Sequence, residues 1–476
     1  MRIHPTLLSI ARGGVAALAL LTPLVAAAAD VDGSKLSPLW GIPFAGILLS
    51  IALMPLLAPV VWHHHYGKIA AGWALAFLLP FAALFGLGAA GSALVHALLA
   101  EYIPFVILLT ALFTVAGGIH IKGSLHGSPG LNTAILAIGA VLASFMGTTG
   151  ASMLLIRPLI RANDNRQHKA HVIVFFIFIV SNAGGSLTPL GDPPLFLGFL
   201  KGVEFFWTVK TIFPETLFLV LTLLAMFYAL DWWYYHKREE MLPVDPTPDT
   251  RAIGFDGAAN FVLLGCIVGL VLMSGVWKSP VSFDVAGTEV GLPGIVRDLG
   301  LIAVTLVSLK ITADQVHEAN QFSWAPMAEV AKLFAGIFLT IIPVIAMLKA
   351  GVNGPFGAVV AAVTRHDGSP DPMMYFWATG ALSSFLDNAP TYLVFFNTAG
   401  GDPQVLMTTL APTLAAISAG AVFMGANTYI GNAPNLMVKA IAEDRGVKMP
   451  SFFGYMAWSG AVLIPLFIIM SFVWFR

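Results

Sequence analysis

Charge, cysteine and basic patches are all scarce in this sequence. Only 10% of its 476 residues are charged, whereas a soluble domain has roughly 25%, and 58% are hydrophobic. The net charge of -1 decides nothing about a nucleic-acid partner, but no basic stripe is present to bind one. Cys266 is the single cysteine, which excludes disulfides and cysteine-based metal sites within one chain. Together with a mean hydropathy of +0.84, these features indicate a protein of the lipid bilayer.

The stretch Ser181–Gly198, SNAGGSLTPLGDPPLFLG, lies between two strongly apolar segments. Its glycines and prolines cannot all sit in one continuous helix, and a broken backbone in a bilayer leaves amide and carbonyl groups unpaired at several kcal/mol each. The stretch also carries Asp192, and an aspartate at membrane depth costs roughly 2.5–3.5 kcal/mol. These features predict a discontinuous transmembrane helix that lines a solute or ion site. A re-entrant turn without a ligand is the alternative.

The same pattern returns later in the chain. GSLTPLGDPPL, at 185–195, is echoed by GANTYIGNAPN, at 425–435, so that Asp192 falls opposite Asn432. The identical pairs are Gly185 and Gly425, Thr188 and Thr428, Gly191 and Gly431, and Pro194 and Pro434. Paired interruptions in corresponding halves are the best sequence indication of a transporter binding site near the bilayer midplane.

A second pair of polar segments keeps the same offset. ASFMGTTGAS, at 143–152, falls on SSFLDNAPTY, at 383–392, and Asp387 stands where the first half has Gly147. A buried aspartate beside Asn388 and a carbonyl freed by Pro390 makes a cluster of hard oxygen ligands. Such a cluster suits Na⁺ or a proton and not a soft metal.

The two halves predict an all-α polytopic membrane protein with two inverted repeats, each with a helical hairpin and a discontinuous transmembrane helix. The region after the first hairpin carries Arg157, Arg161, Arg166 and Lys169, which predicts a cytoplasmic position. The matching region at 397–404 has no Lys or Arg. Matching motifs with opposite loop charge are typical of inverted repeats.

The division of the chain into two repeats predicts four segments. Residues 1–29, with a charged start, an apolar run and small residues at the end, resemble a bacterial-type signal peptide; a dispensable first helix is the alternative. We expect a first membrane repeat at 30–241, a linker at 242–256 and a second membrane repeat at 257–476. The span that ends the first repeat finishes in DWWYYHKREE, whose aromatic and charged residues are typical of a membrane interface.

SNAGGSLTPLGDPP and SSFLDNAP resemble the signature segments of the ion transporter superfamily. That group includes NhaD-type sodium/proton antiporters, arsenite efflux pumps, CitMHS-type citrate carriers and dicarboxylate/sodium symporters. The whole chain is similar to a bacterial branch labelled as citrate transporters or sodium:proton antiporters, although Pro193 and Pro194 stand where the antiporters carry threonines. The resemblance implies a multi-pass protein of the bacterial inner membrane that works as a homodimer with an elevator-like transport domain.

The residues at the breaks favour Na⁺/H⁺ antiport over citrate or dicarboxylate symport. A carrier of polyanions must stabilise two or three negative charges, whereas the breaks offer Ser, Thr and Asn, two acids, and no Arg or Lys. A buried aspartate can instead bind H⁺ and Na⁺ in competition, because either one neutralises it. We therefore expect Asp192 and Asp387 to exchange the ions, with Na⁺ as the transported or coupling ion and with no other cofactor or metal. The expected neutral ligands or braces are Asn182, Ser186, Thr188, Ser144, Thr148, Asn388, Asn427, Thr428 and Asn432.

Two further classes of protein are weaker alternatives. An intramembrane enzyme would need catalytic residues, but the chain has no HExxH, GxSxG or paired-histidine motif. A passive channel could also use broken helices, yet it needs no duplicated breaks in opposed halves. The sequence therefore predicts a secondary active transporter whose substrate stays open between a cation and an organic anion.

Overall fold

Apolar helices make up most of the protein, as its composition predicts. The computed structural model describes residues 32–123, 125–237, 240–241 and 254–476. In this part of the chain, seven helices are long and apolar enough to cross a membrane, or eight if the bent pair α13–α14 forms one span. The structure confirms an all-α polytopic membrane protein.

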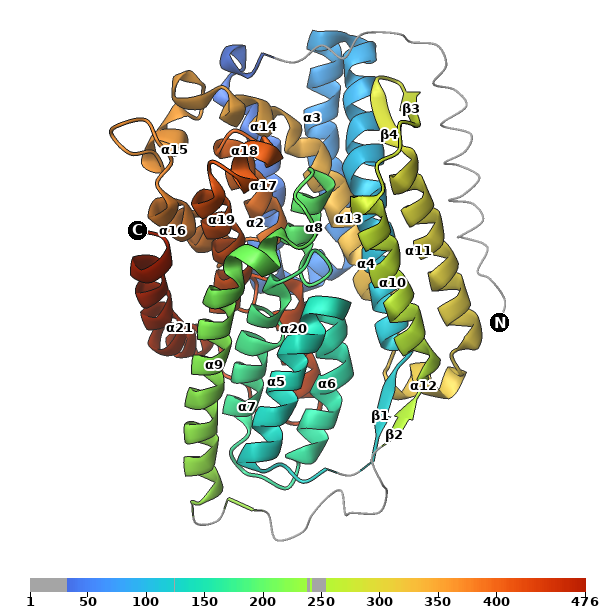
Figure 1. Cartoon of the computed structure of the whole chain (residues 1–476), viewed down its shortest axis with the longest axis vertical. Coiled ribbons are helices and arrows are strands. Elements are labelled where there is room, and N and C mark those ends of the chain that lie inside the picture. The colour runs from blue at the N-terminus through green and yellow to red at the C-terminus, as the bar shows by residue number, and fades with distance from the viewer. Residues whose placement is uncertain (1–31, 124, 238–239, 242–253) are drawn as a thin grey trace.

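One group of helices draws on both halves of the chain, and its members α3, α4, α10 and α11 lie along one flank of the molecule in Figure 1. Its members are α2 (Ile42–Leu57), α3 (Pro59–His96), the π-helical η3 (Ala97–Tyr102), α4 (Ile103–Gly117), α10 (Ala259–Val276), α11 (Leu292–Ile311) and α13 (Ala325–Thr340). α3 packs along α2 and α13, whereas α4, α10 and α11 pack against one another. This group holds most of the long spans.

The second group contains both predicted breaks. In the first half it comprises α5 (Pro129–Met146), α6 (Thr148–Ala162), α7 (Ala170–Ile179), η4 (Ala183–Ser186), α8 (Pro193–Leu200) and α9 (Trp207–Tyr235). In the second half it comprises α14 (Ile342–Lys349), α16 (Pro372–Ser383), α17 (Asn388–Thr398), α19 (Ala411–Met424), η6 (Gly425–Asn427), α20 (Ala433–Asp444) and α21 (Phe452–Trp474). α5 packs against α6 and α9, and α16 packs along α19.

Short elements connect these helices. β1 (His120–Lys122) pairs antiparallel with β2 (Gly254–Asp256), and β3 (Ser282–Val285) forms a hairpin with β4 (Thr288–Gly291). The remaining helical turns are η1 (Gly33–Lys35), η2 (Pro38–Gly41), α12 (Asp314–Ala319), η5 (Gly351–Asn353), α15 (Gly357–Ala362) and α18 (Pro403–Met407). The predicted signal segment at 1–29 and most of the predicted linker at 242–256 lie outside the described residues.

The helices α7 and α19 are too short to cross a bilayer alone. They have 10 and 14 residues, whereas a crossing needs about 20. Each is followed by a short 3₁₀ turn and a non-helical segment before α8 or α20 begins. All residues at 171–185 and at 413–429 are buried, so other helices enclose both breaks. Enclosure by protein is what allows an interrupted backbone at membrane depth.

Candidate functional site

Four helices begin either at the two breaks or at the tips of two helical hairpins, which are formed by α5 with α6 and by α16 with α17. α6 begins at Thr148 and α8 at Pro193, whereas α17 begins at Asn388 and α20 at Ala433. α6 packs against α20, and α8 packs against α17, so each half contributes to both contacts. A helix N-terminus carries unpaired N–H groups and a partial positive charge. The arrangement therefore brings four positive helix ends into one region.

Asp192 lies where these four helix ends meet. It is the N-cap residue of α8 and only 2% exposed, yet its carboxylate forms no capping bond to its own helix. Its Oδ1 accepts hydrogen bonds from the Thr148 hydroxyl at 3.0 Å and from Asn432 Nδ2 at 3.4 Å. Its Oδ2 accepts a hydrogen bond from Asn388 Nδ2. The first turn or N-cap of each of the other three helices thus donates to one carboxylate.

The site is built so that its backbone segments touch. The Thr148 amide donates to the carbonyl of Gly191 at 2.9 Å, which ties the start of α6 to the residue before Asp192. Gly147, just before α6, has φ +80°, a conformation that L side chains rarely adopt. Its counterpart at the same offset is Asp387, which has φ -53°. The two hairpin tips therefore differ at this position because the first one needs a glycine.

Two buried side-chain oxygens near the breaks have no hydrogen-bond partner among the described residues. One is Asn388 Oδ1, on the side chain whose Nδ2 donates to Asp192, and the other is Asn427 Oδ1. The nitrogen atom of each amide already donates a hydrogen bond, which fixes the orientation of the group. Asn388 Nδ2 donates to Asp192, and Asn427 Nδ2 donates to the Ser384 hydroxyl at 2.9 Å. An unpaired buried carbonyl oxygen is a ready ligand for a hard cation or a water molecule.

Asp387 has a different environment from Asp192. It is half-buried and serves as the N-cap of α17, with its Oδ1 accepting the amide of Ala389 at 3.1 Å. Its backbone carbonyl accepts the Thr391 hydroxyl at 3.0 Å. No side-chain hydrogen bond joins Asp387 to Asp192 in the described part of the chain. The two predicted acids therefore lie near each other in the fold but have different partners.

A second row of amides surrounds the central carboxylate. Asn432 Nδ2 also lies 3.2 Å from Asn182 Oδ1 and 3.2 Å from the carbonyl of Ser181. Asn182 Nδ2 in turn donates to Asn435 Oδ1 and to the carbonyl of Ile177, both at 2.8 Å. Asn435 Nδ2 closes the network on the carbonyls of Gly425 and Thr428, each at 2.9 Å. These contacts satisfy carbonyl groups that the two breaks leave without helical partners.

Equivalent serines and threonines brace the two breaks in the same way. In the first half, the Ser144 hydroxyl donates to the carbonyl of Gly184 at 2.6 Å, and the Thr188 hydroxyl donates to the carbonyl of Ser144. In the second half, the Ser384 hydroxyl donates to the carbonyl of Met424 at 3.1 Å, and the Thr428 hydroxyl donates to the carbonyl of Ser384. These residues hold each break to the preceding hairpin and do not contact Asp192.

Ser186 lies apart from the central cluster, which consists of Asp192 and its three donors Thr148, Asn388 and Asn432. Its hydroxyl is 2.7 Å from the Thr216 hydroxyl on α9 and donates to the carbonyl of Ala183 at 2.9 Å. Asn435, by contrast, is fully buried and belongs to the amide network. The sequence did not predict it as a site residue. Its counterpart at the repeat offset is Leu195, so comparison of the two halves gave no signal for it.

No charged partner neutralises Asp192 in the described part of the chain. The side-chain donors to its carboxylate are one hydroxyl and two amides, and no Lys, Arg or His forms an ion pair with it. Within the same residues, no group of three or more His, Cys, Asp or Glu side chains could hold a metal ion. The site is therefore a buried carboxylate held by neutral donors and helix ends.

Gly185 and Gly191 approach each other closely at the first break, and this contact can be tested. A Cβ at Gly191 would lie 2.2 Å from the carbonyl oxygen of Gly185, which is backbone and cannot rotate away. We expect Gly191→Ala to lower the free energy of unfolding by about 1–3 kcal/mol, as overpacking does. Thermal unfolding of the detergent-solubilised protein measures this change. Gly265→Ala on α10, where no atom lies within 4 Å of the new Cβ, is the control and should not destabilise the protein. Equal melting of both variants would contradict the crossing.

A family model described as "Putative citrate transport" matches residues 33–475. A search of curated proteins finds no match. The family match covers every helix that contributes to the cluster around Asp192.

Proposed function

Because the chain belongs to the family described as putative citrate transport, we propose that it is a secondary active transporter that exchanges Na⁺ for H⁺ at Asp192. The chain is a multi-pass membrane protein of a transport family, and this assignment extends that finding to the transported ion. The observation that carries the proposal is the burial of Asp192, which forms no ion pair with a cationic side chain among the described residues.

A buried carboxylate without a cationic partner must be stabilised in another way. The four helix N-termini and the donors Thr148, Asn388 and Asn432 stabilise its charged form in part. A proton or a Na⁺ ion completes the neutralisation, and the two cannot bind the same carboxylate oxygen together. Competition of this kind couples the movement of one cation to that of the other.

Oxygen ligands for Na⁺ are available beside the carboxylate. Asn388 Oδ1 has no hydrogen-bond partner among the described residues, and its amide nitrogen already contacts Asp192. Asp387 lies next to it in the chain and provides a second carboxylate at the start of α17. In the proposed cycle Asp192 binds the exchanged cation, Asn388 and Thr148 orient the carboxylate, and Asp387 adds negative charge to the same region.

We also propose that the two halves are inverted repeats. The helices α6 and α17 begin 240 positions apart, and so do α8 and α20. Ser144 and Thr188 make the same type of bond to the backbone as Ser384 and Thr428. Equivalent breaks that meet at one central point are the arrangement expected of a transporter that alternates access to a fixed site.

Cation-coupled citrate symport is the second candidate. Its support is the family description and the convergence of four helix N-termini, which can bind the carboxylates of an organic anion. In that case a coupling cation at Asp192 would first have to neutralise the carboxylate that otherwise repels the substrate. The two candidates therefore use Asp192 alike and differ in whether citrate is needed for cation movement.

A pH-gradient assay in everted membrane vesicles separates these candidates. We expect Na⁺ or Li⁺ alone to collapse an imposed gradient, and citrate alone to have no effect. A gradient change or uptake of radiolabelled citrate that requires both citrate and Na⁺ would support symport and contradict antiport. Vesicles from cells without the protein supply the background. K⁺ controls for a general effect of salt.

A further inference from the structure

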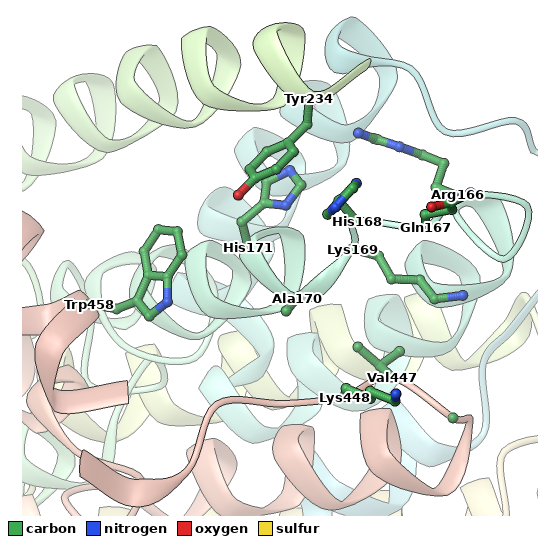
Figure 2. Close-up of a pocket in the computed structure, with 11 residues that line it drawn as sticks. Arg166, Gln167, His168, Lys169, Ala170, His171, Tyr234, Val447, Lys448 and Trp458 are labelled. Atoms are coloured by element: carbon green, nitrogen blue, oxygen red, sulfur yellow. The ribbon is translucent and has the colours of Figure 1, made fainter. Parts of the chain in front are cut away.

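A second polar region lies at the opposite end of α7 from the break. It is a cavity of about 510 Å³ between the start of α7, the end of α9, the loop that follows α20 and the first turns of α21. Figure 2 shows the side chains around it, with Lys448 on the loop that lies across from Lys169 and Ala170 at the start of α7. Because α7 has 10 residues, the cavity lies about 15 Å along the helix from the break.

Most side chains that line the cavity are basic or aromatic, and among the described residues none of the lining residues is acidic. Lys448 is exposed and forms no ion pair with a described residue. Lys169 is half-buried, and its Nζ donates only weakly to the backbone carbonyl of Asp164, at 3.3 Å. Lys169 is also the N-cap residue of α7, and its side chain forms no capping hydrogen bond to that end of the helix. Two ammonium groups and a helix N-terminus thus face the same space, which favours an anion.

The acids behind the cavity are already used by other groups. Asp231 Oδ1 lies 2.7 Å from Arg166 Nη2 and 2.7 Å from His171 Nε2. Glu240 contacts Arg166 Nε at 2.9 Å and His168 Nδ1 at 2.7 Å. The two carboxylates are buried, and they fix Arg166 and the histidines in the cavity wall. They leave the lysines to supply the surplus positive charge.

The cavity lies at the depth of lipid headgroups. Trp232 and Trp233, at the end of α9, are 50% and 51% exposed, and Lys237 Nζ lies 3.9 Å from the centre of the Trp233 ring. Exposed tryptophans and lysines at a helix end mark the membrane–water interface. Tyr234, on the same turn, lines the cavity, and so does Trp458 on α21. The opening is therefore within reach of the bilayer's own anionic groups.

We propose that this cavity binds the phosphate of an acidic phospholipid headgroup. Lys169, Lys448 and the free N–H groups at the start of α7 contact the phosphate, and the ring of Trp458 packs against the glycerol and the first part of the acyl chains. The Tyr234 ring stacks with His168 and His171 and holds them in the cavity wall. Basic cavities between transmembrane helices on the side with excess Lys and Arg are suited to anionic headgroups. The bound lipid joins α7 to the loop between α20 and α21. The assignment does not depend on the ion carried at Asp192.

Lipid titration of the delipidated full-length protein, followed by native mass spectrometry, tests this proposal. The probes are phosphatidylglycerol, whose headgroup is anionic, and phosphatidylcholine, whose headgroup has no net charge, with the same acyl chains so that only the headgroup differs. We expect tighter binding of phosphatidylglycerol to the wild-type protein. The double variant Lys169→Gln with Lys448→Gln should bind phosphatidylglycerol about thirtyfold more weakly, because each lysine near the surface contributes about fivefold.

Lys237→Gln is the matched control, since it removes a lysine of the same interface that lies over the rings of Trp233 and Tyr234 and does not itself line the cavity. It should keep the wild-type preference for phosphatidylglycerol. Equal loss in Lys237→Gln would show a diffuse surface effect and overturn the proposal. No headgroup preference in the wild-type protein would overturn it as well. Lysine-dependent binding of soluble citrate or inorganic phosphate without a lipid preference would assign the cavity to a soluble anion instead.

Both lysines are at least partly exposed, so the double variant should fold, and its melting temperature verifies this.

Discussion

Asp192→Asn is expected to reduce cation-coupled transport to the level of vesicles that lack the protein. The substitution keeps the size of the side chain but removes the charge that we propose binds Na⁺ or H⁺. The variant should still fold, because the new amide oxygen can accept from Thr148, and Asn388 can turn its unpaired Oδ1 toward the new N–H group. Gradient collapse by Na⁺ in everted vesicles measures the activity, and protein in the membrane fraction measures assembly.

Two other aspartates are compared with Asp192, and one of them, Asp402, provides the control. Asp402 is also a helix N-cap, for α18, and its Oδ1 accepts the amide of Gln404 at 2.8 Å, but it lies outside the central cluster. Because Asn caps a helix about as well as Asp, Asp402→Asn should leave transport unchanged. Asp387→Asn should cause partial loss, since Asp387 caps α17 but also adds charge near Asp192. Wild-type transport in Asp192→Asn would contradict the assignment of the exchanging acid.

Arg166→Met is expected to cause the largest loss of stability. The guanidinium is 1% exposed and contacts Asp231, Glu240 and Asn163, at 2.7, 2.9 and 3.1 Å. Its removal leaves two buried carboxylates without their main cationic partner, which typically costs about 3–5 kcal/mol. Thermal unfolding in detergent should show a large decrease in melting temperature, accompanied by a low yield of folded protein.

Arg365→Met is the matched control for that experiment. Arg365 also pairs with an aspartate, Asp371, but at 3.7 Å and with 45% of its side chain exposed. An exposed pair contributes about 1 kcal/mol or less, so this variant should melt close to the wild-type protein. If Arg166→Met and Arg365→Met melted alike, the buried network would not be the element that holds α6, α7 and α9 together at this end.

The breaks and the central cluster could be predicted because local chemistry determines them. Glycine and proline interrupt a helix wherever they occur, so the interruption before Asp192 and its echo before Asn432 are visible in the sequence. The offset between the halves also placed Thr148, Asn388 and Asn432 with Asp192, and the structure brings all four together. Helix-breaking residues and the duplication of the motif therefore carried most of the information about this cluster.

The different surroundings of the two acids could not be predicted from the sequence. Asp192 and Asp387 both precede a proline-containing helix start, and both are surrounded by Asn, Ser or Thr. Their difference arises from tertiary contacts, because Asp387 turns to the amide of Ala389 while Asp192 turns away from its own helix. The Arg166 network escaped prediction for a similar reason. Its members Asn132, Asp231 and Glu240 are far from Arg166 in the chain, and Asp231 lies in a run that resembles an exposed interface.

The most direct test of the central claim is proton release on addition of Na⁺ to the purified protein in weakly buffered detergent solution. If Na⁺ and H⁺ compete for Asp192, added Na⁺ should release protons from the wild-type protein, whereas K⁺ should not. Asp192→Asn should release none, while Asp402→Asn should behave as the wild-type protein does. Equal Na⁺-dependent release from Asp192→Asn, or release from the wild-type protein only when citrate is present, would contradict Na⁺/H⁺ exchange at this residue.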